Sequence, residues 1–115
     1  MNYKYFDIDE FKCQETGEND IKPEFVFSLD ALREECGFPF TITSGYRSPK
    51  HSIEAAKSKP GRHSEGVAAD IAISNATQRH TLVANAIAMG FSGIGVAKTF
   101  VHLDIRNSDP VMWTY

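Results

Sequence analysis

The sequence has little of what marks membrane-spanning, secreted or disulfide-rich proteins. It contains no apolar run of about 18 residues, so we expect no membrane insertion. Its first residues, MNYKYFDIDEF, lack the apolar stretch of a signal peptide, so we expect no Sec-type secretion. Its two cysteines, Cys13 and Cys36, could pair, but no oxidising compartment is indicated, and Cys36 is expected to be a small buried apolar residue.

A strong charge of one sign is also missing. The chain has 12 basic and 15 acidic residues, a formal net charge of −3, which argues against a general nucleic-acid binder. Basic residues nevertheless gather between positions 47 and 62, where Glu54 is the single acid. This stretch is either a solvated loop or a site that attracts carboxylates.

The length and composition are those of one ordinary globular domain. At 115 residues the chain can bury roughly two thirds of its unfolded surface in a single core. We therefore expect one domain spanning residues 1–115, and a monomer.

Helical periodicity is clearest in two stretches. The first runs from Pro23, which suits the first helical position, to Cys36, where Gly37 stops it. The second follows N-cap candidates at 74–77 and ends at Gly90. The candidates for buried faces are Phe25, Val26, Leu29, Leu32 and Cys36 in the first helix, and Leu82, Val83, Ala86, Ile87 and Met89 in the second.

The remaining pattern predicts strands and loops. Strands are expected at 40–43, at 67–73, and in a hairpin whose turn contains Ala97 and Lys98. The other segments are an irregular arm or short strand at 1–22 that buries Phe6 and Phe11, a long loop at 48–62 with a short helical segment, and a surface tail at 107–115 with Trp113 packing back. The sequence thus predicts an α+β fold, a small and mostly antiparallel sheet with two main helices packed on it.

Three residues could form a metal site if the fold brings them together. Two imidazoles, His63 and His102, and one carboxylate, Asp70, make a ligand set that leaves a zinc position open for water, as catalysis requires. The alternatives are chance spacing and a histidine satisfied in the core. Asp70 lies in the apolar run VAADIAI, where a carboxylate without metal would need a partner such as Arg47 or Arg106.

The motifs SGYRSPKHS, HSEGVAAD and GIGVAKTFVHLDIR resemble those of zinc peptidases that trim bacterial cell walls. This is the D-alanyl-D-alanine carboxypeptidase and L-alanyl-D-glutamate endopeptidase family, whose fold is also seen in the Hedgehog signalling domain. The resemblance is to its short, often phage-encoded branch, and it extends from about Phe6 to Arg106. It implies that His63, Asp70 and His102 bind Zn²⁺.

The resemblance also implies roles in substrate binding. Arg47, within SGYRS, would face the substrate with its guanidinium fork and take part in catalysis. Ser44, Tyr46 and His51 are further candidates for the substrate site, the first two as support.

The chain departs from this family where a general base is expected. Many relatives carry an acid or histidine two or three positions before the last histidine ligand, where this chain has Phe100 and Thr99. Asp104 shares a strand face with His102, so we expect it to act either as acid and base or as a group that orients His102. The other candidates for the base are His51, Glu65 and His80. Two further departures, Gly61 and Ser52, suggest a different substrate pocket.

These observations lead to two hypotheses of different classes. The first is a zinc metallopeptidase that hydrolyses a bond in peptidoglycan stem peptides, as carboxypeptidase or endopeptidase. It would be a phage or prophage lysis enzyme made in the cytoplasm, which reaches the wall through a holin or on a phage particle. The second is a non-catalytic, metal-containing domain of the same fold that binds the cell wall or a protein. A purely structural metal site or a metal-free domain is a third reading.

Overall fold

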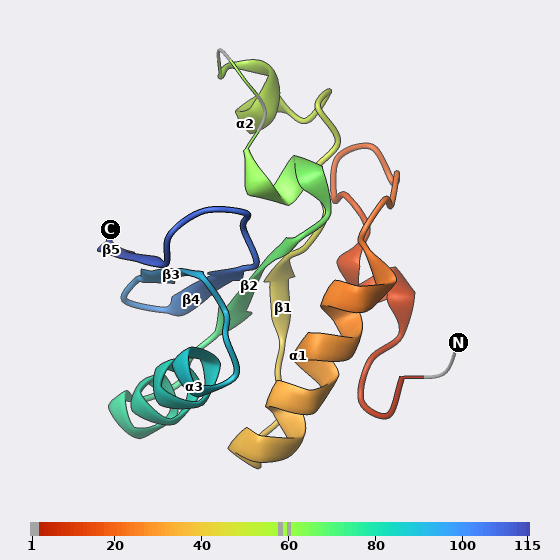
Figure 1. Ribbon diagram of the computed structural model, residues 1–115. Helices are drawn as coiled ribbons and strands as arrows, with labels where there is room; N and C mark the ends of the chain where they lie inside the picture. The colour runs from red at the N-terminus through yellow and green to blue at the C-terminus, as the bar shows by residue number, and fades with distance from the viewer. Residues whose placement is uncertain (1–2, 58, 60) are drawn as a thin grey trace.

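The computed structural model describes residues 3–57, 59 and 61–115 (Figure 1). Two residues of the predicted loop, Ser58 and Pro60, lie outside the described residues. The elements, in chain order, are the 3-10 helix η1 (Ile8–Phe11), α1 (Pro23–Cys36), β1 (Ile42–Ser44), α2 (Ser52–Ala55), the 3-10 helix η2 (Arg62–Glu65), β2 (Ala68–Ala72), α3 (Ala76–Ala88), β3 (Gly93–Val96), β4 (Phe100–Asp104) and β5 (Val111–Thr114).

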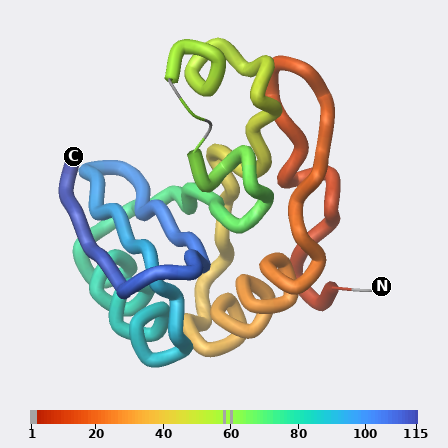
Figure 2. Tube along the Cα trace, turned by 45° about the horizontal axis from the view of Figure 1, so that its top comes forward, coloured from red at the N-terminus to blue at the C-terminus, as the bar shows by residue number. Residues whose placement is uncertain are grey.

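One five-stranded sheet, in the order β1-β2-β4-β3-β5, forms the centre of the molecule. The neighbouring pairs are antiparallel except β3 and β5, which run parallel. The predicted α+β fold with a mostly antiparallel sheet is confirmed. In both ribbon and tube views α2 stands at one end of the molecule and α3 at the other (Figures 1 and 2). Within the described residues, no helix has the length and apolar character needed to span a membrane.

The two main helices form where their periodicity and end residues predict them. Helix α1 begins at Pro23 and stops at Gly37, whose φ of 75° is the left-handed conformation that glycine adopts most easily. Helix α3 is capped by Asn75, whose side chain accepts a hydrogen bond from the Gln78 backbone amide at 2.8 Å. Phe25, Val26, Leu29, Leu32, Leu82 and Ala86 are buried as predicted, and with the inner residues of the sheet they form the core.

Three expectations about burial and local structure need correction. Cys36 is only half-buried because it lies in the last turn of α1. Ile87 and Met89, which lie at the end of α3, are exposed. Of the two alternatives for 1–22, the short strand is wrong, because Asp7 and Glu10 form a capping box and residues 8–11 form a 3-10 helix; Phe6 and Phe11 reach the core as predicted.

The C-terminal tail lies at the surface with Trp113 packing back, as predicted, but Val111–Thr114 also form a strand, β5, which was not predicted. β5 pairs with β3 in the register Gly93 with Val111 and Gly95 with Trp113. Gly95 leaves room for the indole, because a Cβ atom there would lie 2.7 Å from the Trp113 ring. β5 thereby brings an aromatic side chain over the centre of the sheet, next to β4.

Candidate metal centre

Three buried side chains from three different elements meet at the middle of the sheet. His63 lies on η2, Asp70 on β2 and His102 on β4, and β2 and β4 pair Asp70 directly with His102. The Asp70 Oδ1 atom is 3.1 Å from His102 Nδ1 and 3.3 Å from His63 Nε2. Each residue offers one ligand atom, and these atoms all lie within 4.8 Å of one another.

The second nitrogen of each histidine is held by an oxygen, which sets the orientation of both rings. His63 Nδ1 is 2.7 Å from the Gly45 carbonyl oxygen, which can only accept, so Nδ1 carries the proton and Nε2 faces Asp70 with its lone pair. His102 Nε2 is 2.7 Å from Asp104 Oδ2, so Nε2 donates and Nδ1 faces Asp70. Metal-binding histidines show this pattern of a ligand nitrogen on one side and a hydrogen bond on the other.

The donor set fits a divalent metal such as zinc. Burial alone would raise the pKa of Asp70, but the hydrogen bonds and positive charge of the His102 and His63 rings, whenever a proton occupies the nitrogen that faces Asp70, hold that pKa well below its usual range, so the carboxylate is ionised. Burial would likewise lower the pKa of His102, but its bonds to Asp104 and Asp70 raise it, so a proton and a metal compete for this ring. One charged oxygen and two imidazole nitrogens form the three-ligand group typical of open zinc sites.

Asp104 lies behind His102, on the side away from Asp70. It is fully buried, and Arg106 holds both its oxygens, with Nε 2.9 Å from Oδ1 and Nη2 2.6 Å from Oδ2. Burial would raise the pKa of Asp104, but Arg106 and His102 lower it to about 2. Of the two roles predicted for Asp104, this geometry favours orienting His102 and not taking a proton from water on the opposite side of the ring.

We expect Asp104→Asn to weaken metal binding about 10- to 100-fold, because the amide loses the charge that holds the Nε2 proton of His102 and the fork of Arg106. Competition with a chelating dye measures the affinity. Asp109→Asn, which changes an exposed aspartate, is the matched control. Equal affinities of Asp104→Asn and wild type would contradict the orienting role.

Gly93 on β3 leaves the space that Asp104 occupies. A Cβ atom at this position would lie 2.1 Å from Asp104 Oδ1. We therefore expect Gly93→Ala to lower the free energy of unfolding by about 1–3 kcal/mol, since buried groups must shift. Urea titration measures this, with Gly61→Ala as control, where the nearest atom is the flexible Lys57 amine at 3.1 Å. Equal stability of the two variants would argue against tight packing at Gly93.

Arg47 follows β1 and lies beside the three candidate ligands. Its Nη2 atom is 3.8 Å from Asp70 Oδ2, and its Nη1 atom is 3.2 Å from Glu54 Oε2. Its backbone amide donates to the His63 carbonyl oxygen at 3.2 Å. Arg47 thus lines the same cavity as the three candidate ligands.

The other predicted substrate residues do not line this cavity in the described part of the chain. Ser44 pairs with Asp70 across β1 and β2, and Tyr46 is packed in the core, where burial raises its pKa. Ser44 and Tyr46 therefore support the elements that carry the site and do not line the cavity. His51 lies outside the described lining: it caps α2, and its Nε2 atom lies 3.2 Å from Glu15.

The rival candidates for the base lie elsewhere too. Glu65 is exposed and pairs with Arg62 at 3.1 Å, and His80 is exposed on α3.

The cavity over the cluster has a basic and aromatic lining, of which the basic stretch 47–62 supplies Arg47, Lys57 and Arg62, while the aromatic part was not predicted. Its volume is about 340 Å³. Trp113 packs on the His102 ring, with centroids 5.1 Å apart, and Tyr115 packs on Phe100 at the same separation. The alternation of Trp113 and Tyr115, two positions apart, was the available signal for a strand face. The remaining lining residues are Arg47, Lys57, Arg62, His63, Asp70, His102 and Arg106.

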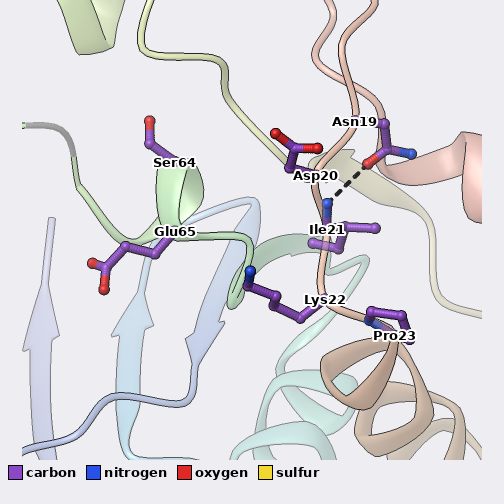
Figure 3. Close-up of a pocket in the computed structure, with 7 residues that line it drawn as sticks. All are labelled: Asn19, Asp20, Ile21, Lys22, Pro23, Ser64 and Glu65. Atoms are coloured by element: carbon purple, nitrogen blue, oxygen red, sulfur yellow. Dashed lines mark hydrogen bonds between the residues drawn. The ribbon is translucent and has the colours of Figure 1, made fainter.

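A second cavity of about 680 Å³ lies beside η2, lined by 19–23, Ser64 and Glu65 (Figure 3). The carboxylates of Asp20 and Glu65 do not converge in this view, and Asn19 turns back to accept a hydrogen bond from the Ile21 amide at 3.2 Å. This cavity is larger, but it lacks the grouped histidine and carboxylate ligands found at the centre of the sheet.

Comparison with known proteins agrees with the geometry. A family model described as Peptidase M15 matches residues 4–104, which include the three candidate ligands, Arg47 and Asp104. No curated protein matches the chain.

Proposed function

Because the chain belongs to the peptidase M15 family, which makes it a metal-dependent peptidase, we propose that it hydrolyses a peptide bond in the stem peptides of bacterial peptidoglycan. Zn²⁺ is the proposed metal, and His63, Asp70 and His102 are the proposed ligands. The observation that carries the proposal is the buried cluster of these three residues beside Arg47, inside the matched range.

Each group near the cluster has a distinct part in the proposed reaction. When bound, the metal supplies Lewis acidity and lowers the pKa of water toward neutrality. Asp104 and Arg106 keep His102 turned toward the metal position. Arg47 offers hydrogen-bond donors to the substrate carbonyl or carboxylate, where negative charge increases during hydrolysis.

The lining of the cavity suits a short acidic peptide. Four basic side chains surround it, from Arg47, Lys57, Arg62 and Arg106. Stem peptides carry carboxylates, which guanidinium groups bind through two parallel hydrogen bonds. The aromatic wall of Phe100, Trp113 and Tyr115 offers apolar surface for the alanine methyl groups of such a substrate.

One observation favours the second hypothesis, a metal-containing domain that binds peptide without cleaving it. Among the described lining residues, Asp70 is the single carboxylate, and it belongs to the proposed ligand set. No second carboxylate of the lining is therefore placed to take a proton. A binding domain would retain stem peptide intact under conditions in which an enzyme releases products.

We further propose that the protein is a monomeric phage or prophage lysis enzyme, made in the cytoplasm and acting on the wall after holin-type release or on a phage particle. The likeness of its motifs to the short, often phage-encoded branch supports this. Co-expression with a holin tests the delivery route, since lysis should require both proteins. Light scattering tests the monomer.

Digestion of purified muropeptides tests the proposed substrate. The zinc-loaded protein is incubated with muropeptides, and mass spectrometry identifies the new amine terminus, which names the cleaved bond. We expect products with the loaded protein and none after chelation. Unchanged muropeptides at full zinc occupancy would overturn the proposed activity and favour the binding domain.

A further inference from the structure

Glu54 is a buried charge outside the metal-binding cluster. It lies on α2, in the basic stretch, with 1% of its surface exposed. Burying a carboxylate is costly unless hydrogen bonds and charges compensate for the lost water. The groups that compensate Glu54 show what it holds in place.

Three donors from separate parts of the loop converge on this carboxylate. Oε1 accepts from the Gly61 backbone amide at 2.7 Å, and Oε2 accepts from Lys57 Nζ at 2.9 Å and Arg47 Nη1 at 3.2 Å. Burial would raise the pKa of Glu54, but these hydrogen bonds lower it to about 2. Both oxygens are occupied by donors, so Glu54 is a fixed anion and not a proton acceptor at neutral pH.

Arg47 is held between two carboxylates by this arrangement. Nη1 contacts Glu54, while Nη2 points toward Asp70 at 3.8 Å. A guanidinium is planar and rigid, so fixing one nitrogen limits the direction in which the others can donate. The Arg47 side chain keeps 18% of its surface exposed, on the cavity lined by His63, Asp70 and His102.

We infer that Glu54 is a positioning residue that orients the Arg47 guanidinium toward the substrate. The inference rests on the proposed function, in which Arg47 binds the substrate. Glu54 also joins α2 to Gly61, two positions before His63, so the same carboxylate sets the loop next to the cluster.

Glu54→Gln tests this inference with little change in side-chain size. The amide can still accept from Gly61, but it offers one acceptor oxygen in place of two, so Arg47 loses its partner or competes for it. We expect kcat/KM for a stem peptide to fall about 10- to 100-fold, with metal content unchanged. In an Arg47→Ala background the same substitution should have almost no further effect, because the two residues act as a unit.

Glu15→Gln is the matched control. Glu15 fixes the same loop from outside, through Ser52 N at 3.1 Å and His51 Nε2 at 3.2 Å, and does not contact Arg47. We expect its kcat/KM to stay within about twofold of wild type. Two results would overturn the inference and mean that Glu54 only supports the loop. One is an equal loss of kcat/KM in Glu54→Gln and Glu15→Gln; the other is a loss of kcat/KM from Glu54→Gln that persists in the Arg47→Ala background.

A readout that needs no turnover separates this inference from the proposed function. The Arg47 Nε–Hε resonance, assigned by its absence in Arg47→Lys, reports how firmly the guanidinium is held. We expect it to be sharp in wild type and Glu15→Gln and broadened in Glu54→Gln. If the wild-type protein hydrolyses no peptide, the proposed function is wrong, but this resonance still tests the role of Glu54. A resonance that stays equally sharp in Glu54→Gln would overturn the inference. If Glu54→Gln does not fold, Glu54→Asp takes its place, because aspartate keeps the charge but has a shorter reach toward Arg47. The results expected of Glu54→Gln, and those that would overturn the inference, then apply to Glu54→Asp.

Discussion

Replacing His102 by alanine is expected to lower the rate of peptide hydrolysis at least about a thousandfold, because a bound metal would contribute several kcal/mol and the variant lacks one of the three proposed ligands. The loss should appear in kcat, since Arg47 and the cavity wall still contact the substrate. Metal binding should weaken in parallel. In this variant Asp104 loses its contact with His102 but keeps its two hydrogen bonds from Arg106, so we expect the sheet to remain folded.

Metal content by elemental analysis and steady-state kinetics measure this effect together. His80→Ala is the control, because it removes an exposed histidine on α3 that does not belong to the described lining of the cavity. A folded His102→Ala variant that hydrolyses peptide at the wild-type rate would show that this histidine is not a ligand of the active metal.

Arg47→Ala is expected to lower kcat about 10²- to 10³-fold with metal content unchanged. The guanidinium lies 3.8 Å from the candidate ligand Asp70 but donates no bond to either histidine, so the variant keeps its ligands. Lysine at this position keeps the charge and loses the planar fork, so Arg47→Lys should recover only part of the activity.

Kinetics with one stem peptide, at equal metal occupancy, compare these variants. Arg79→Ala is the control, because Arg79 lies on α3 and donates to the Lys98 carbonyl oxygen at 2.8 Å. A wild-type kcat in Arg47→Ala would remove Arg47 from the reaction and leave it a partner of Glu54.

The sequence predicted well those parts of the fold that are determined by residues close together in the chain. Pro23 and Gly37 set the limits of α1 through their own backbone preferences, and the turn at Ala97 and Lys98 joins two apolar strands. Asp70 stood out because a carboxylate in VAADIAI needs a partner. The family motifs then connected it with His63 and His102, which the β2–β4 register brings together.

The missed parts depend on tertiary contacts. β5 pairs parallel with β3, a contact that no local pattern specifies, so Trp113 and Tyr115 were not expected beside the metal cluster. Glu54 resembled a lone acid on a basic surface loop, yet the folded loop buries it under Arg47, Lys57 and Gly61. The role of Asp104 depends on which ring nitrogen of His102 faces it. That His102 and Asp104 are two positions apart in the sequence does not determine this nitrogen.

Titration of the metal-free protein with Zn²⁺, followed by hydrolysis of a stem peptide, tests the central claim most directly. We expect activity to rise in proportion to added zinc up to one equivalent per chain, and His102→Ala to show no such rise. Full binding of one equivalent with no hydrolysis, or hydrolysis that persists in the chelated protein, would contradict it.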